Sequence, residues 1–194
     1  MIIGVDIDDV LGETNIAFDD FHNKKYGTNF KKEDHFTFNL DEVWDLPREE
    51  MVKRLRAFFS EGHYINISPV LGSEKALREL SKKHEIKIIT ARMEDFKNQT
   101  LEWLNKHYGE ITLEVHHANH YYGLNNETKS DICVRLGVEM LIDDCLEFSL
   151  ECAEKEIKVL LLDNPWNQMD NLPKNVTRVS DWNNIITHIK ALNN

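Results

Sequence analysis

Residues 1–11, MIIGVDIDDVL, form the stretch around which the rest of the chain is organised. Residues 1–5 are apolar and rich in β-branched side chains, which predicts a buried strand. The run ends at Asp6, Asp8 and Asp9, and Asp6 and Asp8 can point the same way because alternate strand residues share a face. Two carboxylates at the end of a buried strand need a proton or a cation, and a hard divalent cation prefers oxygen ligands. From these residues alone, the alternative is a strand that runs into a solvated acidic turn.

Composition limits the class of protein. The 194 residues are 41% apolar, which suffices for one buried core with or without an insertion. No apolar run is long enough to cross a bilayer, and the first residues lack the basic leader of a signal peptide. The formal net charge of -11 argues against nucleic-acid polymers but permits a small phosphorylated ligand. Three irregularly spaced cysteines argue against a disulfide framework, so we expect a cytoplasmic protein.

The segment after the first strand predicts a helical insertion. Apolar residues recur at helical spacing over residues 14–26, which Gly27 ends. A second helix begins after Pro47, where Met51, Leu55 and Phe58 lie on one stripe. We therefore predict a small helical cap over residues 12–68, with residues 1–11 and 69–194 forming the core.

The remainder of the chain alternates short apolar runs with amphipathic segments. The predicted strands lie at residues 85–90, 111–115, 138–142 and 157–162, and the predicted helices at 73–83, 94–108, 129–136, 146–155 and 180–192. This alternation predicts a doubly wound, Rossmann-like parallel α/β sheet. Ligands of such sheets bind beyond the carboxyl ends of the strands, so Asp6, Asp8, Thr90, Asp143 and Asp144 are expected to meet.

These residue types suit phosphoryl transfer. Mg²⁺ would bridge Asp6 and Asp143 to a phosphate oxygen, and Lys129 would neutralise the remaining charge. Asp6 would then attack phosphorus and form an aspartyl-phosphate. Asp8 would protonate the leaving oxygen and later activate water. Phosphate would also receive hydrogen bonds from the hydroxyl of Thr90 and from the backbone N–H that follows it, which belongs to Ala91.

Four motifs together resemble those of the haloacid-dehalogenase-like phosphohydrolases, over essentially the whole chain. They are Asp-x-Asp with Val-Leu, the Ile-Ile-Thr-Ala-Arg segment, Lys129 and the Ile-Asp-Asp segment, in that family's order. The resemblance implies that Asp6 is the nucleophile and Asp8 the acid and base. It also implies that Asp6, the backbone carbonyl of Asp8 and Asp143 hold the metal, with Asp144 beside it or binding its waters.

Further features resemble the 5′(3′)-deoxyribonucleotidases and their bacterial relatives. These features are the small cap after the first motif, residues 163–168 (DNPWNQ) and residues 180–182 (SDW). The resemblance implies a Mg²⁺-dependent 5′-nucleotidase acting on (deoxy)nucleoside monophosphates. Two positions depart from the family: Thr14 replaces an aromatic base-stacking residue, and Ala91 replaces a frequent Ser.

The cap has to select the substrate, because the core binds only phosphate. Four aromatic residues of the cap are candidates to stack on a base, or else pack within the cap: Phe18, Phe36, Phe38 and Trp44. Arg92 is expected to reach the substrate, to pair with a cap carboxylate, or to form an ordinary surface ion pair. Asn167 is expected to line the mouth of the site or to turn its loop.

Other interpretations stay open at this point. His116, His117 and His120 lack the spacing of a zinc protease site, and we expect a polar loop there. The substrate could be a sugar phosphate or another small phosphate. A receiver-like phospho-switch uses the same residue types in another order, and an idle fold could serve binding alone. The expected partner is a small phosphorylated molecule, with no nucleic-acid polymer and no membrane, and a homodimer is kept open.

Overall fold

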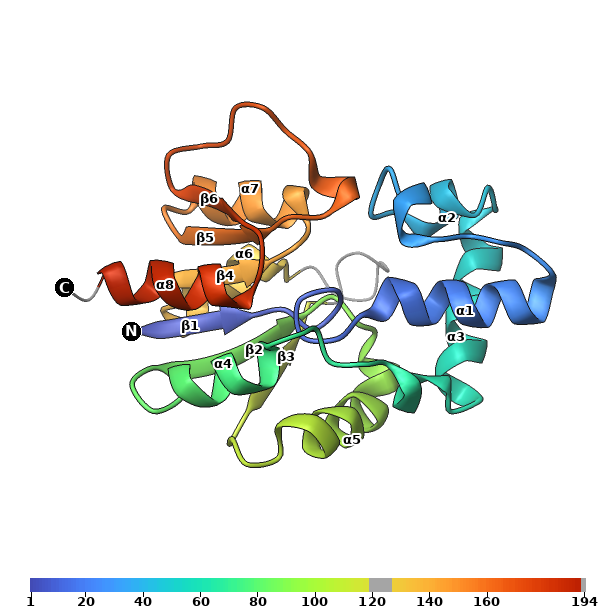
Figure 1. The fold of residues 1–194 in the computed structure, drawn as a ribbon, viewed down its shortest axis with the longest axis horizontal. Coiled ribbons are helices and arrows are strands. Elements are labelled where there is room, and N and C mark those ends of the chain that lie inside the picture. The colour runs from blue at the N-terminus through green and yellow to red at the C-terminus, as the bar shows by residue number, and fades with distance from the viewer. Residues whose placement is uncertain (119–126, 193–194) are drawn as a thin grey trace.

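The computed structural model describes residues 1–118 and 127–192. Within these residues, six strands form one parallel sheet in the order β3-β2-β1-β4-β5-β6 (Figure 1). The strands are β1 (Ile2–Val5), β2 (Glu85–Thr90), β3 (Glu114–His117), β4 (Met140–Asp143), β5 (Lys158–Leu162) and β6 (Val176–Val179). The predicted doubly wound parallel α/β sheet is therefore confirmed. The order reverses between β1 and β4, and a crevice for ligands is expected beyond their carboxyl ends.

Helices cover both faces of the sheet (Figure 1). One face carries α4 (Ser73–Leu80), α5 (Lys97–Tyr108) and α8 (Trp182–Leu192), and the other carries α6 (Lys129–Leu136) and α7 (Leu146–Glu154). The buried apolar residues accordingly form two clusters. None of the helices among residues 1–118 and 127–192 combines the length and the apolar character that a membrane span requires.

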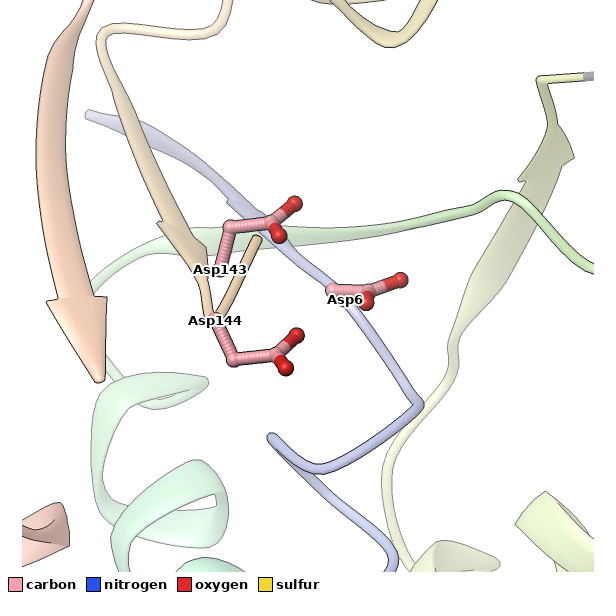
Figure 2. A group of neighbouring side chains, drawn as sticks. All are labelled: Asp6, Asp143 and Asp144. Carbon is pink, nitrogen blue, oxygen red and sulfur yellow. The ribbon is translucent and has the colours of Figure 1, made fainter. Parts of the chain in front are cut away.

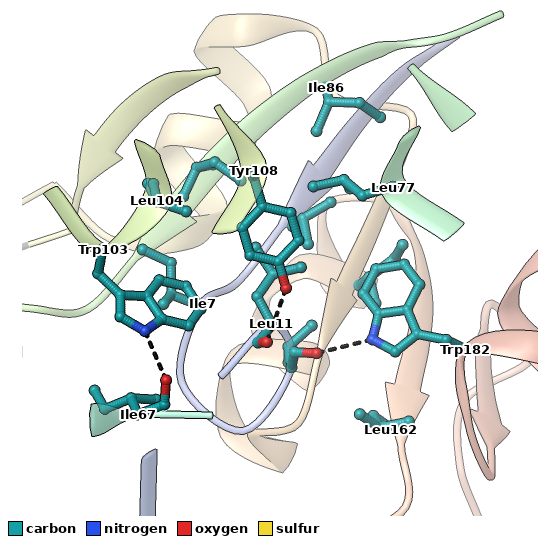
Figure 3. Close-up of a cluster of buried hydrophobic side chains, with 14 of the residues drawn as sticks. Ile7, Leu11, Ile67, Leu77, Ile86, Trp103, Leu104, Tyr108, Leu162 and Trp182 are labelled. Carbon is teal, nitrogen blue, oxygen red and sulfur yellow. Dashed lines mark hydrogen bonds between the residues drawn. The ribbon is translucent and has the colours of Figure 1, made fainter. Parts of the chain in front are cut away.

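Two buried aromatic residues hold the chain just after β1, and a third holds the segment that precedes α4 (Figure 3). Tyr108 donates its hydroxyl to the carbonyl oxygen of Leu11 at 2.9 Å, and Trp182 donates Nε1–H to that of Val10 at 2.8 Å. Trp103 donates Nε1–H to the carbonyl oxygen of Ile67 at 2.9 Å. A Cβ at Gly12 would lie 2.8 Å from Ile67 Cγ2, so only glycine fits between these neighbours. The turn that carries the acidic motif is thus fixed by the core.

The predicted cap residues stand beyond the carboxyl ends of the strands (Figure 1). They form α1 (Thr14–Tyr26), η1 (Lys32–Asp34), α2 (Leu40–Val43), α3 (Arg48–Ser60) and η2 (His63–Asn66). Aromatic side chains fill the space between α1 and α3, where the ring centroids of Phe18 and Phe58 are 4.7 Å apart. The division of the chain into a core and a cap at residues 12–68 remains a prediction.

Several predicted elements differ from those observed. The strand predicted at residues 111–115 is β3 at Glu114–His117, because His116 and His117 pair in register with Ile89 and Thr90 of β2. The loop predicted for these two histidines is therefore wrong, and His120 lies outside the described residues. Strand β6 lies between the strand predicted at 157–162 and the helix predicted at 180–192, where we predicted no strand. The helix predicted over 94–108 begins with a 3₁₀ turn, η3 (Glu94–Phe96), before α5.

Candidate active site

Three buried carboxylates meet at the junction of β1 and β4 (Figure 2). Asp6 follows β1, and its backbone N–H donates to the carbonyl oxygen of Ile142 in β4 at 3.0 Å. Asp143 ends β4, and Asp144 follows it. One carboxylate oxygen from each of Asp6, Asp143 and Asp144 lies within 4.8 Å of the others. The pairing of the two strands therefore produces the expected acidic cluster.

Lys129 holds two of these carboxylates. Its Nζ lies 2.7 Å from Asp143 Oδ2 and 3.0 Å from Asp6 Oδ1, and the side chain is 1% exposed. Lys129 is the first residue of α6, which Thr128 caps by accepting a hydrogen bond from the backbone N–H of Asp131. The helix start predicted from the sequence thus positions this ammonium group against Asp6 and Asp143.

The buried cluster carries an excess of negative charge. Burial, reinforced by Asp143 and Asp8, raises the pKa of Asp6 to about 7 despite the opposing effect of Lys129. Burial, together with Asp9 and Asp143, also raises the pKa of Asp144 well above its ordinary value. Burial alone would lower the pKa of Lys129, but Asp143 and Asp6 outweigh it and hold that pKa well above its usual range. One ammonium group therefore leaves the cluster undercompensated.

The cluster fits a divalent cation. It supplies three carboxylates, the oxygen donors that Mg²⁺ prefers. Asp6 Oδ1 is buried. Lys129 Nζ forms an ion pair with it at 3.0 Å, but no donor among the described residues is aligned for a hydrogen bond to it. A cation would balance the charge and satisfy this oxygen.

The carboxylate of Asp8 is held separately from the other three. Arg92 donates to it from Nε at 2.9 Å and from Nη2 at 2.7 Å, and Thr14 donates its hydroxyl at 2.7 Å. Arg92 thus pairs with the acidic motif that follows β1, neither with a cap carboxylate nor in a surface ion pair, and its contact with the substrate stays a prediction. Thr14, at the position of the family's stacking residue, instead orients Asp8.

Two further buried polar residues lie next to Asp8 and Arg92. Thr90 ends β2, and its hydroxyl oxygen accepts the backbone N–H of Arg92 at 3.1 Å. Asp9 has a φ of 55°, in the left-handed region, and its carboxylate accepts the backbone N–H of Asn15 at 3.2 Å. Burial and the neighbouring Asp8 raise the pKa of Asp9 well above its ordinary value. No role was predicted for Asp9, although its position directly after Asp8 indicated one.

A cavity of about 130 Å³ opens above these groups. Asp6, Asp8, Ala91, Arg92 and Lys129 are among its polar and backbone lining, and the cap contributes an apolar wall. The residues of that wall are Phe18, Phe38, Leu40, Met51, Leu55 and Phe59.

The structure separates the aromatic candidates of the cap into two groups. Phe18 and Phe38 line the cavity. Trp44 does not line it, because its ring stacks on His22 inside the cap with centroids 4.3 Å apart. Phe36 is 69% exposed and lies outside the lining.

Asn167 and Trp166 brace the acidic cluster from the loop after β5. Asn167 is buried and donates Nδ2–H to the carbonyl oxygens of Asp144 and Leu162, both at 2.7 Å, so it turns its loop and does not line the cavity. Trp166 donates Nε1–H to Asp144 Oδ2 at 2.7 Å. The role of Trp166 was not predicted, since nothing in the local sequence links it to a residue 22 positions earlier.

The fold is that of the haloacid-dehalogenase-like hydrolases. A hydrolase of this kind from Streptococcus pneumoniae superposes with a TM-score of 0.71 at 14% identity, covering 97% of each chain. A hydrolase of this kind from Deinococcus radiodurans superposes with a TM-score of 0.66 at 14% identity, covering 99% of this chain and 96% of the other.

A comparison of the sequence with protein-family models assigns the chain to a family. A family model described as 5′ nucleotidase, deoxy (pyrimidine), cytosolic type C protein matches residues 1–192, so the chain belongs to that family. A protein of Bacillus cereus, provisionally named a nucleotidase, is 27% identical over 194 residues and 98% of each chain. The prediction of a phosphomonoester hydrolase of the nucleotidase type is confirmed, and the phospho-switch is not favoured.

Proposed function

We propose that the protein is a Mg²⁺-dependent 5′-nucleotidase that hydrolyses (deoxy)nucleoside monophosphates through an aspartyl-phosphate on Asp6. The observation that carries this proposal is the contact of one buried ammonium, Lys129 Nζ, with both Asp6 and Asp143 at the floor of a cavity with an aromatic wall. Membership of the nucleotidase family supports the choice of substrate class.

In the first half of the reaction, a carboxylate oxygen of Asp6 attacks phosphorus. A new O–P bond forms as the bond from phosphorus to the nucleoside 5′-oxygen breaks, and Asp8 gives its proton to that oxygen. Lys129 reduces the repulsion between the attacking carboxylate and the phosphate dianion. Arg92 and Thr14 fix the direction of the Asp8 side chain.

In the second half, Asp8 takes a proton from a water molecule, which attacks the phosphorus of the aspartyl-phosphate. The acyl phosphate bond breaks, inorganic phosphate leaves and Asp6 is regenerated. Asp6, Asp143 and the backbone carbonyl of Asp8 would hold Mg²⁺, with Asp144 beside it, and the bound metal would neutralise charge that develops on the phosphoryl oxygens.

The cap supplies the contacts for the leaving group. Phe18 and Phe38 present aromatic surface to the cavity, which suits the face of a base. The acidic floor lies beneath this wall, so a phosphate on the metal would place its nucleoside toward the cap.

A panel of phosphate esters tests the proposal. Phosphate release is measured with deoxynucleoside monophosphates, ribonucleotides and sugar phosphates, in Mg²⁺ and in a chelator. We expect kcat/KM to be highest for the deoxynucleotides and activity to be lost in the chelator. A higher kcat/KM for sugar phosphates would instead assign the protein to another small phosphate, and activity in the chelator would refute the metal dependence.

A further inference from the structure

The carboxylates of the acidic cluster are held by two different kinds of group. Lys129 contacts Asp6 and Asp143, and the backbone N–H of Cys145 donates to Asp143 Oδ1 at 2.9 Å. Asp144 is served by a different group, the indole Nε1–H of Trp166, which donates to Oδ2 at 2.7 Å. The ring of Trp166 is 6% exposed, so this hydrogen bond is shielded from water.

The loop that carries Trp166 is tied to the sheet. Asn167 donates to the backbone of Asp144 and of Leu162, as described above. Arg178 of β6 donates from Nη2 to the carbonyl oxygen of Asn167 at 2.7 Å. The indole is therefore fixed relative to the end of β4, and it holds the Asp144 carboxylate in one direction.

The same indole faces the cap. The Lys32 ammonium lies 5.5 Å from the centroid of the Trp166 ring, and the His35 ring centroid lies 5.9 Å from it. His35 is buried, and its Nε2 lies 2.8 Å from Asp19 Oδ2 of α1. In Figure 1 the orange segment after β5 accordingly approaches the blue segment between α1 and α2. Trp166 thus joins an α1-anchored part of the cap to the acidic cluster.

The small size of the cavity bears on the contact between Trp166 and the cap. Its volume of about 130 Å³ is well below the roughly 300 Å³ at the lower end of ordinary ligand pockets. Under the proposed function, we expect a bound nucleoside monophosphate to shift the cap relative to the core. That movement would change the cover over the Trp166 ring.

We propose that Trp166 is a positioning residue that fixes Asp144 for a divalent cation and couples the cap to the metal site. This inference rests on the metal site of the proposed function. Because coupling between two sites is reciprocal, bound metal would stabilise the cap segment at residues 31–39, and the closed cap would favour the metal.

Calorimetric titration of the full chain with Mg²⁺ tests the positioning role. Trp166→Phe keeps the ring but removes the N–H, and we expect its Mg²⁺ affinity to fall on the order of tenfold. Trp166→His places Nε2 where the indole nitrogen lies, so it should recover part of the affinity. Trp103→Phe is the matched control, because it also removes a buried indole hydrogen bond, here to Ile67, and should leave the affinity unchanged.

Hydrogen exchange at residues 31–39 tests the coupling. We expect saturating Mg²⁺ to slow exchange there in the wild type and in Trp103→Phe, but not in Trp166→Phe. Equal Mg²⁺ affinities of Trp166→Phe and the wild type would overturn the positioning role, and unchanged Mg²⁺-dependent protection in that variant would overturn the coupling. If Trp166→Phe does not fold, Trp166→Gln, which lacks the rigid indole, is titrated in its place. A Kd for Mg²⁺ about tenfold above that of the wild type then supports the role, and a Kd equal to that of the wild type overturns it. A wild type that binds no Mg²⁺ would overturn the proposed metal site and this inference with it.

Discussion

Arg92 donates two hydrogen bonds to Asp8, from Nε at 2.9 Å and from Nη2 at 2.7 Å, although 84 residues separate them in the chain. The guanidinium is almost fully buried, and the hydroxyl of Thr14 approaches the same carboxylate. The proposed acid and base is therefore held by a planar group whose geometry a lysine cannot reproduce.

Replacing Arg92 tests the importance of that geometry. Arg92→Lys keeps the charge but loses the paired hydrogen bonds, so Asp8 is misdirected and we expect kcat to fall about 100-fold. Steady-state phosphate release measures the effect. Arg56→Lys is the matched control, because Arg56 pairs with the exposed Asp95 and its replacement should leave kcat unchanged. An Arg92→Lys enzyme with wild-type kcat would show that Asp8 needs no such orientation.

Lys129 is expected to be essential for the stability of the metal-free fold. Lys129→Met leaves Asp6 and Asp143 buried without their common cation, which should lower the free energy of unfolding by about 3–5 kcal/mol. Urea denaturation in a chelator measures the loss, and added Mg²⁺ should restore part of it. Lys158→Met, at an exposed position, should change little. Equal stability of both variants would contradict the charge balance described for the cluster.

The contribution of Asp6 to the stability of the metal-free protein should fall as pH rises from about 4 to about 7. The pKa of Asp6 is about 7 in the fold against an ordinary value of 3.8, so between these values the folded state holds a proton that the unfolded state has released. Because Mg²⁺ replaces that proton, the stabilisation by Mg²⁺ should grow over the same range. Thermal unfolding with chelator and with Mg²⁺ at several pH values measures both trends. A Mg²⁺ effect that does not depend on pH would argue against protonation of the cluster.

Two phenylalanines on either side of Thr37 offer a matched test of the cap wall. Phe38 lines the cavity, whereas Phe36 is 69% exposed and lies outside it. Phe38→Ala should raise KM for nucleotides several-fold, since stacking on a base contributes about 1–3 kcal/mol. Phe36→Ala should leave KM unchanged. The account of the cap would be wrong if Phe36→Ala had the larger effect.

Local patterns in the sequence were sufficient to predict most of the helices and strands. Helix α1 spans Thr14–Tyr26 as predicted, because its apolar spacing and Gly27, with a φ of 70°, mark the face and the end. Strand β2 likewise matches its prediction, since Ile86, Ile88 and Ile89 are all buried. The acidic cluster was predicted as well, because the carboxyl ends of the strands of one parallel sheet lie at the same edge, where ligands bind.

Other features depend on neighbours that one sequence does not identify. Strand β6 is short, and its two inner residues, Thr177 and Arg178, are only partly buried, so it shows no apolar run. His116 and His117 join β3 because β2 supplies their pairing partners. The partners of Asp8 and Asp144 come from distant segments, and only the packed chain brings Arg92 and Trp166 to them.

The most direct test of the central claim is the site of phosphoryl attachment during turnover. The wild type is mixed with a nucleoside monophosphate labelled in its phosphate, the reaction is quenched in acid, and the peptides are analysed for the label. We expect the label on the peptide that contains Asp6, at the side chain of Asp6, and no label and no phosphate release in a folded Asp6→Asn variant. Label on another residue, or sustained turnover by Asp6→Asn, would contradict the aspartyl-phosphate mechanism.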